Sequence, residues 1–191
     1  MTFQATYRTP GAFSDMLMFS DGEVLTGLCF EGSPDLAKHQ LGGAVRDLPV
    51  FRETRRWLDL YFSGKDPGFV PPYRLVGATP FREEVSREML RIPFGATTTY
   101  GAIAARLAKR HGAPKMSARA VGAAVGWNPI CLVVPCHRVL GSDGNITGYG
   151  GGIENKVALL RHEGHDPARF ALPRHGRHWL APRAAEETFR A

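Results

Sequence analysis

The sequence has few cysteines, and none of them are spaced like a metal-binding pair. The chain contains three, Cys29, Cys131 and Cys136, and no two of them form a Cys-X-X-Cys motif. The N-terminus also lacks the charged start and apolar block of a secretory leader. An odd number of cysteines without an export signal argues against a disulfide framework. We therefore expect free thiols, no metal site and an intracellular protein.

No apolar run reaches the roughly 18 residues needed to cross a bilayer. The 191 residues are 43% hydrophobic and 22% charged, which is ordinary for a soluble globular protein of one large or two small domains. The net charge of +6 biases the chain moderately toward a polyanion such as nucleic acid, although many soluble proteins are mildly basic. We expect a cytoplasmic location, or a nuclear one in a eukaryote, and no membrane partner.

Turn signals divide the chain into two parts. Apolar stretches at 17–19 and 23–30 flank Ser20-Asp21-Gly22, a pattern that predicts a β-hairpin. Residues 47–63 have apolar side chains at helical spacing, and glycines and prolines crowd 64–72, which indicates a linker. We predict an α+β fold with an N-terminal α/β domain containing an antiparallel sheet, a mainly helical C-terminal domain and a tail. The predicted boundaries are 1–75, 76–164 and 165–191.

Each of three helical segments in the second part follows a residue that can cap it. Thr79 and Ser117 have side-chain oxygens suited to a helix N-terminus, and Thr98 and Thr99 precede the second helix. The second and third helices, joined by a short turn with glycine and proline, fit a helix-turn-helix, although helical hairpins also occur in proteins that do not bind DNA. The predicted helices cover residues 80–92, 100–110 and 118–125.

A short apolar run leads to a reactive pair of side chains. Residues 130–134 are apolar and partly β-branched, which predicts a buried strand just before Cys136 and His137. A free thiol is only a few per cent thiolate at neutral pH, and an adjacent base makes it a better nucleophile. Such a base needs an orienting carboxylate, and Glu163, after a last predicted helix at about 154–162, is the best-placed candidate.

A bare Cys-His pair is nevertheless more often a buried structural cysteine beside a surface histidine. Cys29 and Cys131 lie in apolar runs, where cysteine behaves as a small hydrophobic residue. We expect both to be core residues without a chemical role.

Several motifs that occur in the same order as in a known family favour a reactive role for Cys136 over a structural one. Over residues 79–164 the chain resembles the O6-alkylguanine-DNA alkyltransferases, also called methylated-DNA–protein-cysteine methyltransferases; over the first 75 the resemblance is only architectural. It implies an RNase H-like N-terminal domain, a DNA-binding helix-turn-helix, a monomer and no metal or organic cofactor. The matching pieces are Arg119-Ala120-Val121-Gly122, Asn128-Pro129, Pro135-Cys136-His137-Arg138-Val139, Gly148-Tyr149 with Gly151, and His162-Glu163-Gly164.

The resemblance assigns chemical roles to five residues. Cys136 accepts the alkyl group once and irreversibly, and His137, oriented by Glu163, serves as its base through a water. Tyr100 helps to extrude the base and donates a proton to the departing guanine. Asn128 ties the DNA-binding helices to the active-site segment.

The resemblance also assigns the partner, duplex DNA containing O6-alkylguanine or O4-alkylthymine. The damaged base must be flipped out of the duplex, since its O6 is otherwise hidden. The helix at 118–125 enters the minor groove, where Arg119 fills the gap left by the base. The remaining implied site residues are Ala118, Ala120 and Gly122 at the groove and Pro135, Val139, Tyr149 and Gly150 around the alkyl pocket.

Two other function classes compete with this hypothesis. A protein that only recognises alkylated bases lacks the reactive cysteine, so Cys136 argues against it. A cysteine hydrolase with a Cys-His-Glu set needs an oxyanion hole and turns over repeatedly. The chain also departs from the family pattern at Ser86, at Trp127 and at Gly150, where the family often has serine or alanine, so one hydroxyl contact is expected to be missing.

Overall fold

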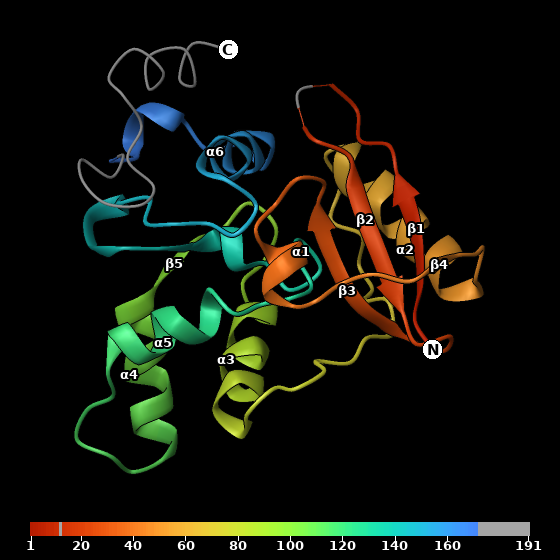
Figure 1. Ribbon diagram of the computed structural model, residues 1–191. Helices are drawn as coiled ribbons and strands as arrows, with labels where there is room; N and C mark the ends of the chain where they lie inside the picture. The colour runs from red at the N-terminus through yellow and green to blue at the C-terminus, as the bar shows by residue number, and fades with distance from the viewer. Residues whose placement is uncertain (12, 172–191) are drawn as a thin grey trace.

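The computed structural model describes residues 1–11 and 13–171 and combines a sheet with helices (Figure 1). The N-terminal part is a four-stranded sheet in the order β3-β2-β1-β4. Strands β1, β2 and β3 are antiparallel, as predicted, whereas β4 was not predicted and runs parallel to β1. The mixed α and β content confirms the predicted class, and the RNase H-like likeness stays a prediction. The elements are β1 (Phe3–Tyr7), β2 (Met16–Ser20), β3 (Leu25–Phe30), α1 (Asp35–Lys38), β4 (Ala44–Val45) and α2 (Pro49–Phe62).

The predicted hairpin is confirmed as the β2–β3 pair. Its turn is closed by Asp21, whose Oδ1 accepts hydrogen bonds from the backbone N–H groups of Glu23 and Val24, both at 3.0 Å. Gly22 has a φ of +112°, which explains why glycine stands there. The local turn chemistry therefore fixes the register that pairs Met16 with Phe30.

The predicted linker is pinned against the sheet. The indole of Trp57 in α2 donates to the carbonyl of Phe69 at 2.8 Å, and Leu25 of β3 hydrogen-bonds to Pro72 on one side and Arg74 on the other. One hydrophobic cluster includes residues from both sides of residue 75. The boundary at that residue stays a prediction.

The helices of the C-terminal part begin where their caps predict. The side-chain oxygens of Thr79, Thr99 and Ser117 accept from backbone N–H groups three residues on, at 3.3, 3.1 and 3.2 Å. The N-cap predictions for Thr79 and Ser117 are confirmed, Thr99 caps α4, and α4 packs against α5, while the helix-turn-helix stays a prediction. The elements are α3 (Pro80–Leu90), β5 (Thr98–Thr99), α4 (Tyr100–Arg110) and α5 (Ala118–Val125).

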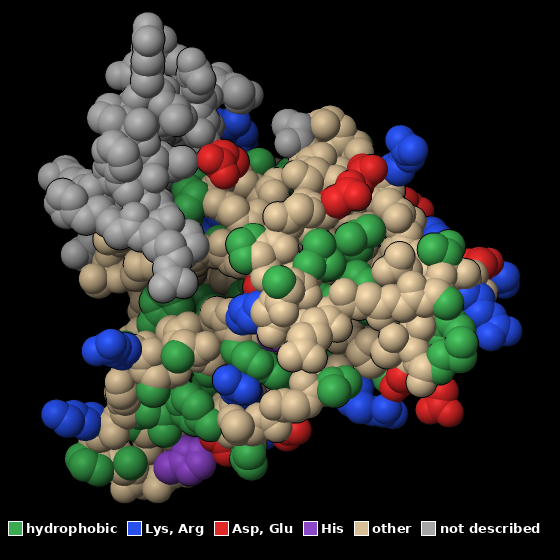
Figure 2. Space-filling view, in the orientation of Figure 1, with side chains coloured by type: hydrophobic (Ala, Val, Ile, Leu, Met, Phe, Trp, Pro, Cys, Tyr) green, Lys and Arg blue, Asp and Glu red, His purple; other side chains and the backbone are tan. Residues whose placement is uncertain are grey.

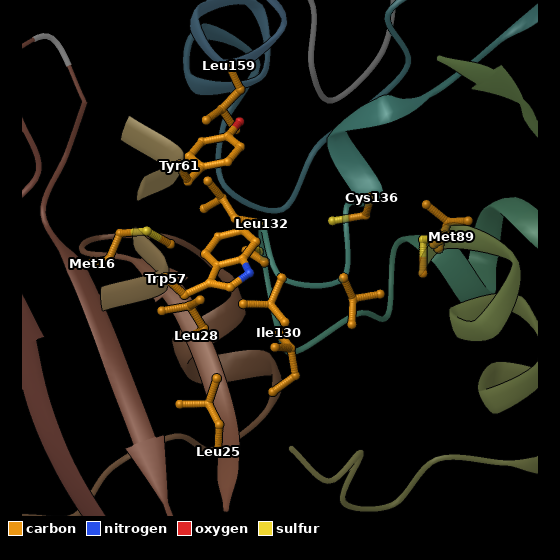
Figure 3. Close-up of a cluster of buried hydrophobic side chains, with 14 of the residues drawn as sticks. Met16, Leu25, Leu28, Trp57, Tyr61, Met89, Ile130, Leu132, Cys136 and Leu159 are labelled. Atoms are coloured by element: carbon orange, nitrogen blue, oxygen red, sulfur yellow. The ribbon is translucent and has the colours of Figure 1, made fainter. Parts of the chain in front are cut away.

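The prediction of a strand at residues 130–134 was wrong. Only Ile130 pairs, in a single bridge to Leu28 of β3, and the next residues form a turn in which Leu132 has a φ of +63°. The run is apolar because it is buried between the sheet and the helices (Figure 3). Hydrophobic periodicity alone does not distinguish such a buried turn from a buried strand.

The chain then forms a short active-site turn, a two-stranded pairing and the last helix. Strand β6 runs parallel to β5, and α6 confirms the predicted last helix, with Val157 and Leu160 buried. Residues 172–191, most of the predicted tail, lie outside the described residues. In the described part, no helix is both long and apolar enough to cross a membrane. The elements are η1 (Cys136–Arg138), β6 (Val139–Leu140), η2 (Ser142–Gly144), α6 (Ile153–His162) and η3 (Pro167–Arg169).

Candidate active site

Cys136 lies at the start of the η1 turn and is 7% exposed. Its Sγ accepts a hydrogen bond from the side-chain amide of Asn128 at 3.1 Å. The same amide donates to the carbonyl of Val134 at 2.8 Å, while its oxygen accepts from the backbone N–H of Ile130 at 3.1 Å. Asn128 therefore fixes the buried turn and the thiol together, between α5 and the active-site segment.

The surroundings of Cys136 favour its thiolate. The pKa of the Cys136 thiol is lowered, first by a hydrogen bond from the Cys131 thiol and then by the Asn128 amide, and these outweigh the effect of burial. The pKa of Cys131 is raised well above its usual range, so its thiol stays neutral, and its Sγ donates to Oδ2 of Asp35 at 3.9 Å. All three cysteines are free and buried, as expected. Cys131 lies in the hydrophobic core, as expected, and its thiol also influences the pKa of Cys136.

A buried lysine stands behind the nucleophile. Lys156 of α6 is 0% exposed, and its Nζ donates to the carbonyl of Val139 at 2.8 Å. Burial lowers the pKa of Lys156 to about 8, and the Lys156 charge in turn lowers the pKa of Cys136. A lysine without solvent is costly, which marks this position as one where charge is needed.

The carboxylate of Glu163, the residue at which α6 ends, is the centre of a buried hydrogen-bond network. Burial alone would raise the pKa of Glu163, but hydrogen bonds from His137 and Arg138 lower it to about 2. The carboxylate is therefore charged at neutral pH. Its donors are His137 Nε2 at 2.7 Å, Tyr61 Oη at 2.9 Å, Gly95 N at 3.2 Å and Arg138 Nε, which lies 3.0 Å from Oε1 and 2.9 Å from Oε2.

The hydrogen bond to Glu163 determines the tautomer of His137. Because a carboxylate only accepts hydrogen bonds, Nε2 of His137 carries the hydrogen and Nδ1 keeps its lone pair. Burial lowers the pKa of His137 despite the nearby carboxylate, so the ring is neutral. Its Nδ1 is buried and has no hydrogen-bond partner among the described residues. His137 is thus oriented by Glu163 and able to take up one proton.

Cys136 opens into a cavity of about 600 Å³. Two predicted aromatic residues line it, Tyr100 at the start of α4 and Tyr149 in the glycine-rich loop of residues 141–152. The Tyr100 hydroxyl accepts a hydrogen bond from Thr147 at 2.9 Å, and burial raises the pKa of Tyr100. The phenol is therefore protonated and available as a donor. The cavity is also lined by Asp35, Lys38, Ala118, Arg119, Gly122, Asn128, Gly148 and Gly150.

Not every expected residue reaches this cavity. Pro135 and Val139 are not among the lining residues of the described part, because Pro135 precedes the η1 turn and Val139 is fully buried in β6. Ala118, Arg119 and Ala120 are exposed at the start of α5, beside the mouth of the cavity. A Cβ at Gly122 would meet the Tyr100 ring at an ordinary contact distance of 3.7 Å, so packing within the chain does not require glycine there.

Two basic side chains, Lys38 and Arg119, line the cavity together with the carboxylate of Asp35. Figure 2 shows Lys and Arg side chains standing out over the region of α4 and α5. Among the described residues, no group of three or more His, Cys, Asp or Glu side chains is arranged to hold a metal ion. The site thus combines a buried thiol, a neutral histidine and a cavity wall with charges of both signs.

Comparison with known proteins places this arrangement. Residues 80–165 match the family model of the 6-O-methylguanine DNA methyltransferase DNA-binding domain. A methylated-DNA–protein-cysteine methyltransferase of Haemophilus influenzae is 37% identical over 154 residues, which are 81% of this chain and 83% of the relative. This chain belongs to the methylated-DNA–protein-cysteine methyltransferase family.

Two further relatives of this methyltransferase agree with that assignment. The Mycobacterium leprae methylated-DNA–protein-cysteine methyltransferase is 45% identical over 150 residues, 78% of this chain and 86% of the relative. The crystal structure of Mycobacterium tuberculosis OGT in complex with DNA has a TM-score of 0.70 at 37% identity and covers 88% of this chain and 94% of that one. The resemblance drawn from the motifs is confirmed.

Four residues of the methyltransferase site have no predicted role in the sequence: Asp35, Tyr61, Arg138 and Lys156. Arg138 stands next to His137 in the matching motif. Because a buried Glu163 needs a cationic partner, this role of Arg138 could have been predicted. Lys156 sits in an amphipathic helix, where a lysine is normally solvated. Asp35 and Tyr61 come from the N-terminal part, and only the fold brings them to the site.

Proposed function

We propose that this protein repairs DNA by moving the alkyl group of O6-alkylguanine, and of O4-alkylthymine, to its own Cys136. The observation that carries the proposal is the Cys136 thiol, which has a lowered pKa, is followed directly by the His137–Glu163 pair and faces a cavity lined by residues of α5. The named relatives are methylated-DNA–protein-cysteine methyltransferases, and one related structure holds DNA. Both facts support the same reaction here.

The transfer follows from the positions of three groups. His137 Nδ1 takes the proton of the Cys136 thiol through a water, and Glu163 stabilises the resulting imidazolium. The thiolate attacks the alkyl carbon; the S–C bond forms as the C–O6 bond breaks, the guanine accepts a proton from the Tyr100 hydroxyl, and the proton held on His137 returns to Tyr100 through water. The product is a thioether, which neither water nor a thiol reverses readily. Each molecule therefore acts once, as a monomer and without a cofactor.

Access to the lesion requires that the base leave the duplex. Residues with small side chains begin α5, which lets the helix approach the floor of the minor groove. The Arg119 side chain stands at the mouth of the cavity, where it can occupy the space of the flipped base. The basic surface over α4 and α5 supplies attraction to phosphates that weakens with salt.

The proposal is tested by mixing the protein with a duplex that contains O6-methylguanine. We expect the mass spectrum to show one methyl group on the Cys136 peptide at completion, and none in the Cys136→Ala variant. Cys131→Ala is the matched control for loss of a buried thiol, and it should still accept one methyl group at a reduced rate. Methyl release beyond one equivalent, or an unmodified Cys136, would contradict the proposal.

Base flipping predicts a selective effect of Arg119→Ala. Because unstacking a base costs a few kcal/mol, loss of the side chain that fills the gap should slow transfer from duplex DNA by roughly tenfold or more. Transfer from a single strand with the same lesion should change little, because no base pair has to open. Single-turnover rates on both substrates measure this, with the exposed Arg87→Ala on α3 as control. Equal slowing on both substrates would assign Arg119 a different role.

A further inference from the structure

A carboxylate from the N-terminal part forms part of the alkyl pocket. Asp35 of α1 is 2% exposed and lines the cavity together with Cys136 and Gly150. Its Oδ1 pairs with Lys38 Nζ at 2.9 Å, and the same Nζ donates to the carbonyl of Gly126, where α5 ends. The short helix α1 thus lies between the sheet and α5 (Figure 1) and presents a buried charge to the site.

The glycine-rich loop is shaped around this carboxylate. A Cβ built on Gly150 would overlap the carboxylate of Asp35, and the hydroxyl of Ser33 donates to the carbonyl of Gly150 at 3.1 Å. The side chain that the family often carries at this position has no room here, because the Asp35 carboxylate fills its place. In this chain, a polar contact from the loop is therefore replaced by a negative charge from α1.

The charge of Asp35 reaches the nucleophile. Its Oδ2 accepts a hydrogen bond from the Sγ of Cys131 at 3.9 Å, and the Cys131 thiol in turn influences the pKa of Cys136. In keeping with this proximity, the Asp35 charge acts to raise the pKa of both thiols. Cations also lie around the pocket: Lys38 pairs with Asp35 and lines the cavity, Arg119 lines it as well, and Lys156 is bound to Val139 and does not line it.

We propose that Asp35 is a specificity-determining residue whose negative charge in the pocket wall disfavours transfer of anionic alkyl groups to Cys136 relative to neutral ones. The inference rests on the proposed function and deepens it. In O6-carboxymethylguanine the carboxylate is bonded directly to the carbon that Sγ attacks, so it must enter the region that Asp35 faces. Two like charges a few ångströms apart in a site with little water repel strongly. Methyl and other uncharged groups meet no such barrier.

The first test needs no DNA. Iodoacetate and iodoacetamide have nearly the same size and the same reaction, in which an S–C bond forms and iodide leaves, but only iodoacetate is charged. The measured quantity is the ratio of the two rate constants at Cys136, followed by mass spectrometry of its peptide. We expect Asp35→Asn to raise the iodoacetate-to-iodoacetamide ratio by roughly fivefold or more. Asp47→Asn removes the same charge from an exposed position and should leave the ratio unchanged.

A second variant guards against a local rearrangement at Asp35. Lys38→Met keeps the carboxylate and removes its ion-pair partner, so it should lower the same ratio. An unchanged ratio in Asp35→Asn, or changes of the same sign in both variants, would overturn the proposal.

The second test uses DNA. Duplexes with O6-carboxymethylguanine and with O6-propylguanine, a neutral lesion of similar size, are compared in single-turnover transfer. Asp35→Asn should raise the carboxymethyl rate relative to the propyl rate by a similar factor. If the wild-type protein accepts no methyl group from DNA, the proposed function fails while the haloacetate result stands. If methyl transfer occurs and the lesion ratio is unchanged in Asp35→Asn, the specificity role fails alone.

Discussion

Replacing Glu163 with alanine is expected to lower the free energy of unfolding by about 3–5 kcal/mol, because it leaves the buried guanidinium of Arg138 without its counter-charge. Arg138 is 7% exposed and bonds to both oxygens of Glu163. His137 and Tyr61 lose an acceptor in the same variant. Urea unfolding followed by circular dichroism measures the change. Glu83→Ala, which removes an exposed carboxylate 3.9 Å from Arg87, should cost less than about 0.5 kcal/mol.

The same carboxylate predicts a pH dependence. The folded pKa of Glu163, about 2, lies below its ordinary value of 4.5, so its stabilising contribution is present above pH 4.5 and is lost as the pH falls toward 2. Between pH 6 and pH 3 this loss amounts to about 2 kcal/mol. The isosteric Glu163→Gln variant should lack that part of the acid sensitivity. If wild type and Glu163→Gln lose the same stability over this range, the carboxylate is not the charged centre of the network.

Local chemistry predicted the helices and the hairpin of this protein well. The caps at Thr79, Thr99 and Ser117 act between neighbouring residues, so the sequence carries the whole signal. The strand prediction for the segment from Ile130 to Val134 was wrong because the conformation there depends on distant parts of the chain. The apolar character of this segment reflects burial between two distant parts of the chain, and the positive φ of Leu132 is imposed by that packing.

The site residues also fall into two groups, those that the sequence could predict and those that only the fold brings to the site. The motif residues Cys136, His137 and Glu163 could be predicted because they stand in one recognisable series, and the structure brings His137 and Glu163 within 2.7 Å. Asp35 and Tyr61 reach the site only through the fold of the sheet and α2. No pattern near either residue points to a thiol or a carboxylate a hundred positions away.

Lys156→Met is expected to make the protein more stable and less reactive at pH 7. The folded pKa of Lys156, about 8, is below its ordinary value of 10.5, so keeping the ammonium buried costs about 3 kcal/mol at neutral pH. Methionine fills a similar volume without charge. It leaves the carbonyl of Val139 without its donor, which returns about 1–2 kcal/mol of that gain. A net stabilisation of about 1–2 kcal/mol remains.

The difference in stability between the wild type and Lys156→Met should also depend on pH. Because the folded pKa is depressed, the cost is fully present below pH 8 and disappears as the pH rises from about 8 to 10.5. The wild type should therefore gain stability relative to Lys156→Met over that range. Urea unfolding at pH 7 and pH 10 measures the difference, with exposed Lys65→Met as a control that shows none.

Reactivity should change in the opposite direction to stability. The Lys156 charge lowers the pKa of Cys136, so its removal leaves less thiolate at neutral pH and slows alkylation of Cys136 by iodoacetamide. The rate of the variant should recover at higher pH, where the thiol ionises without help. A variant that is stabilised yet equally reactive at pH 7 would show that Asn128 and Cys131 alone hold the thiolate. A slower and more stable variant would show that this protein retains a costly buried cation for the sake of its nucleophile.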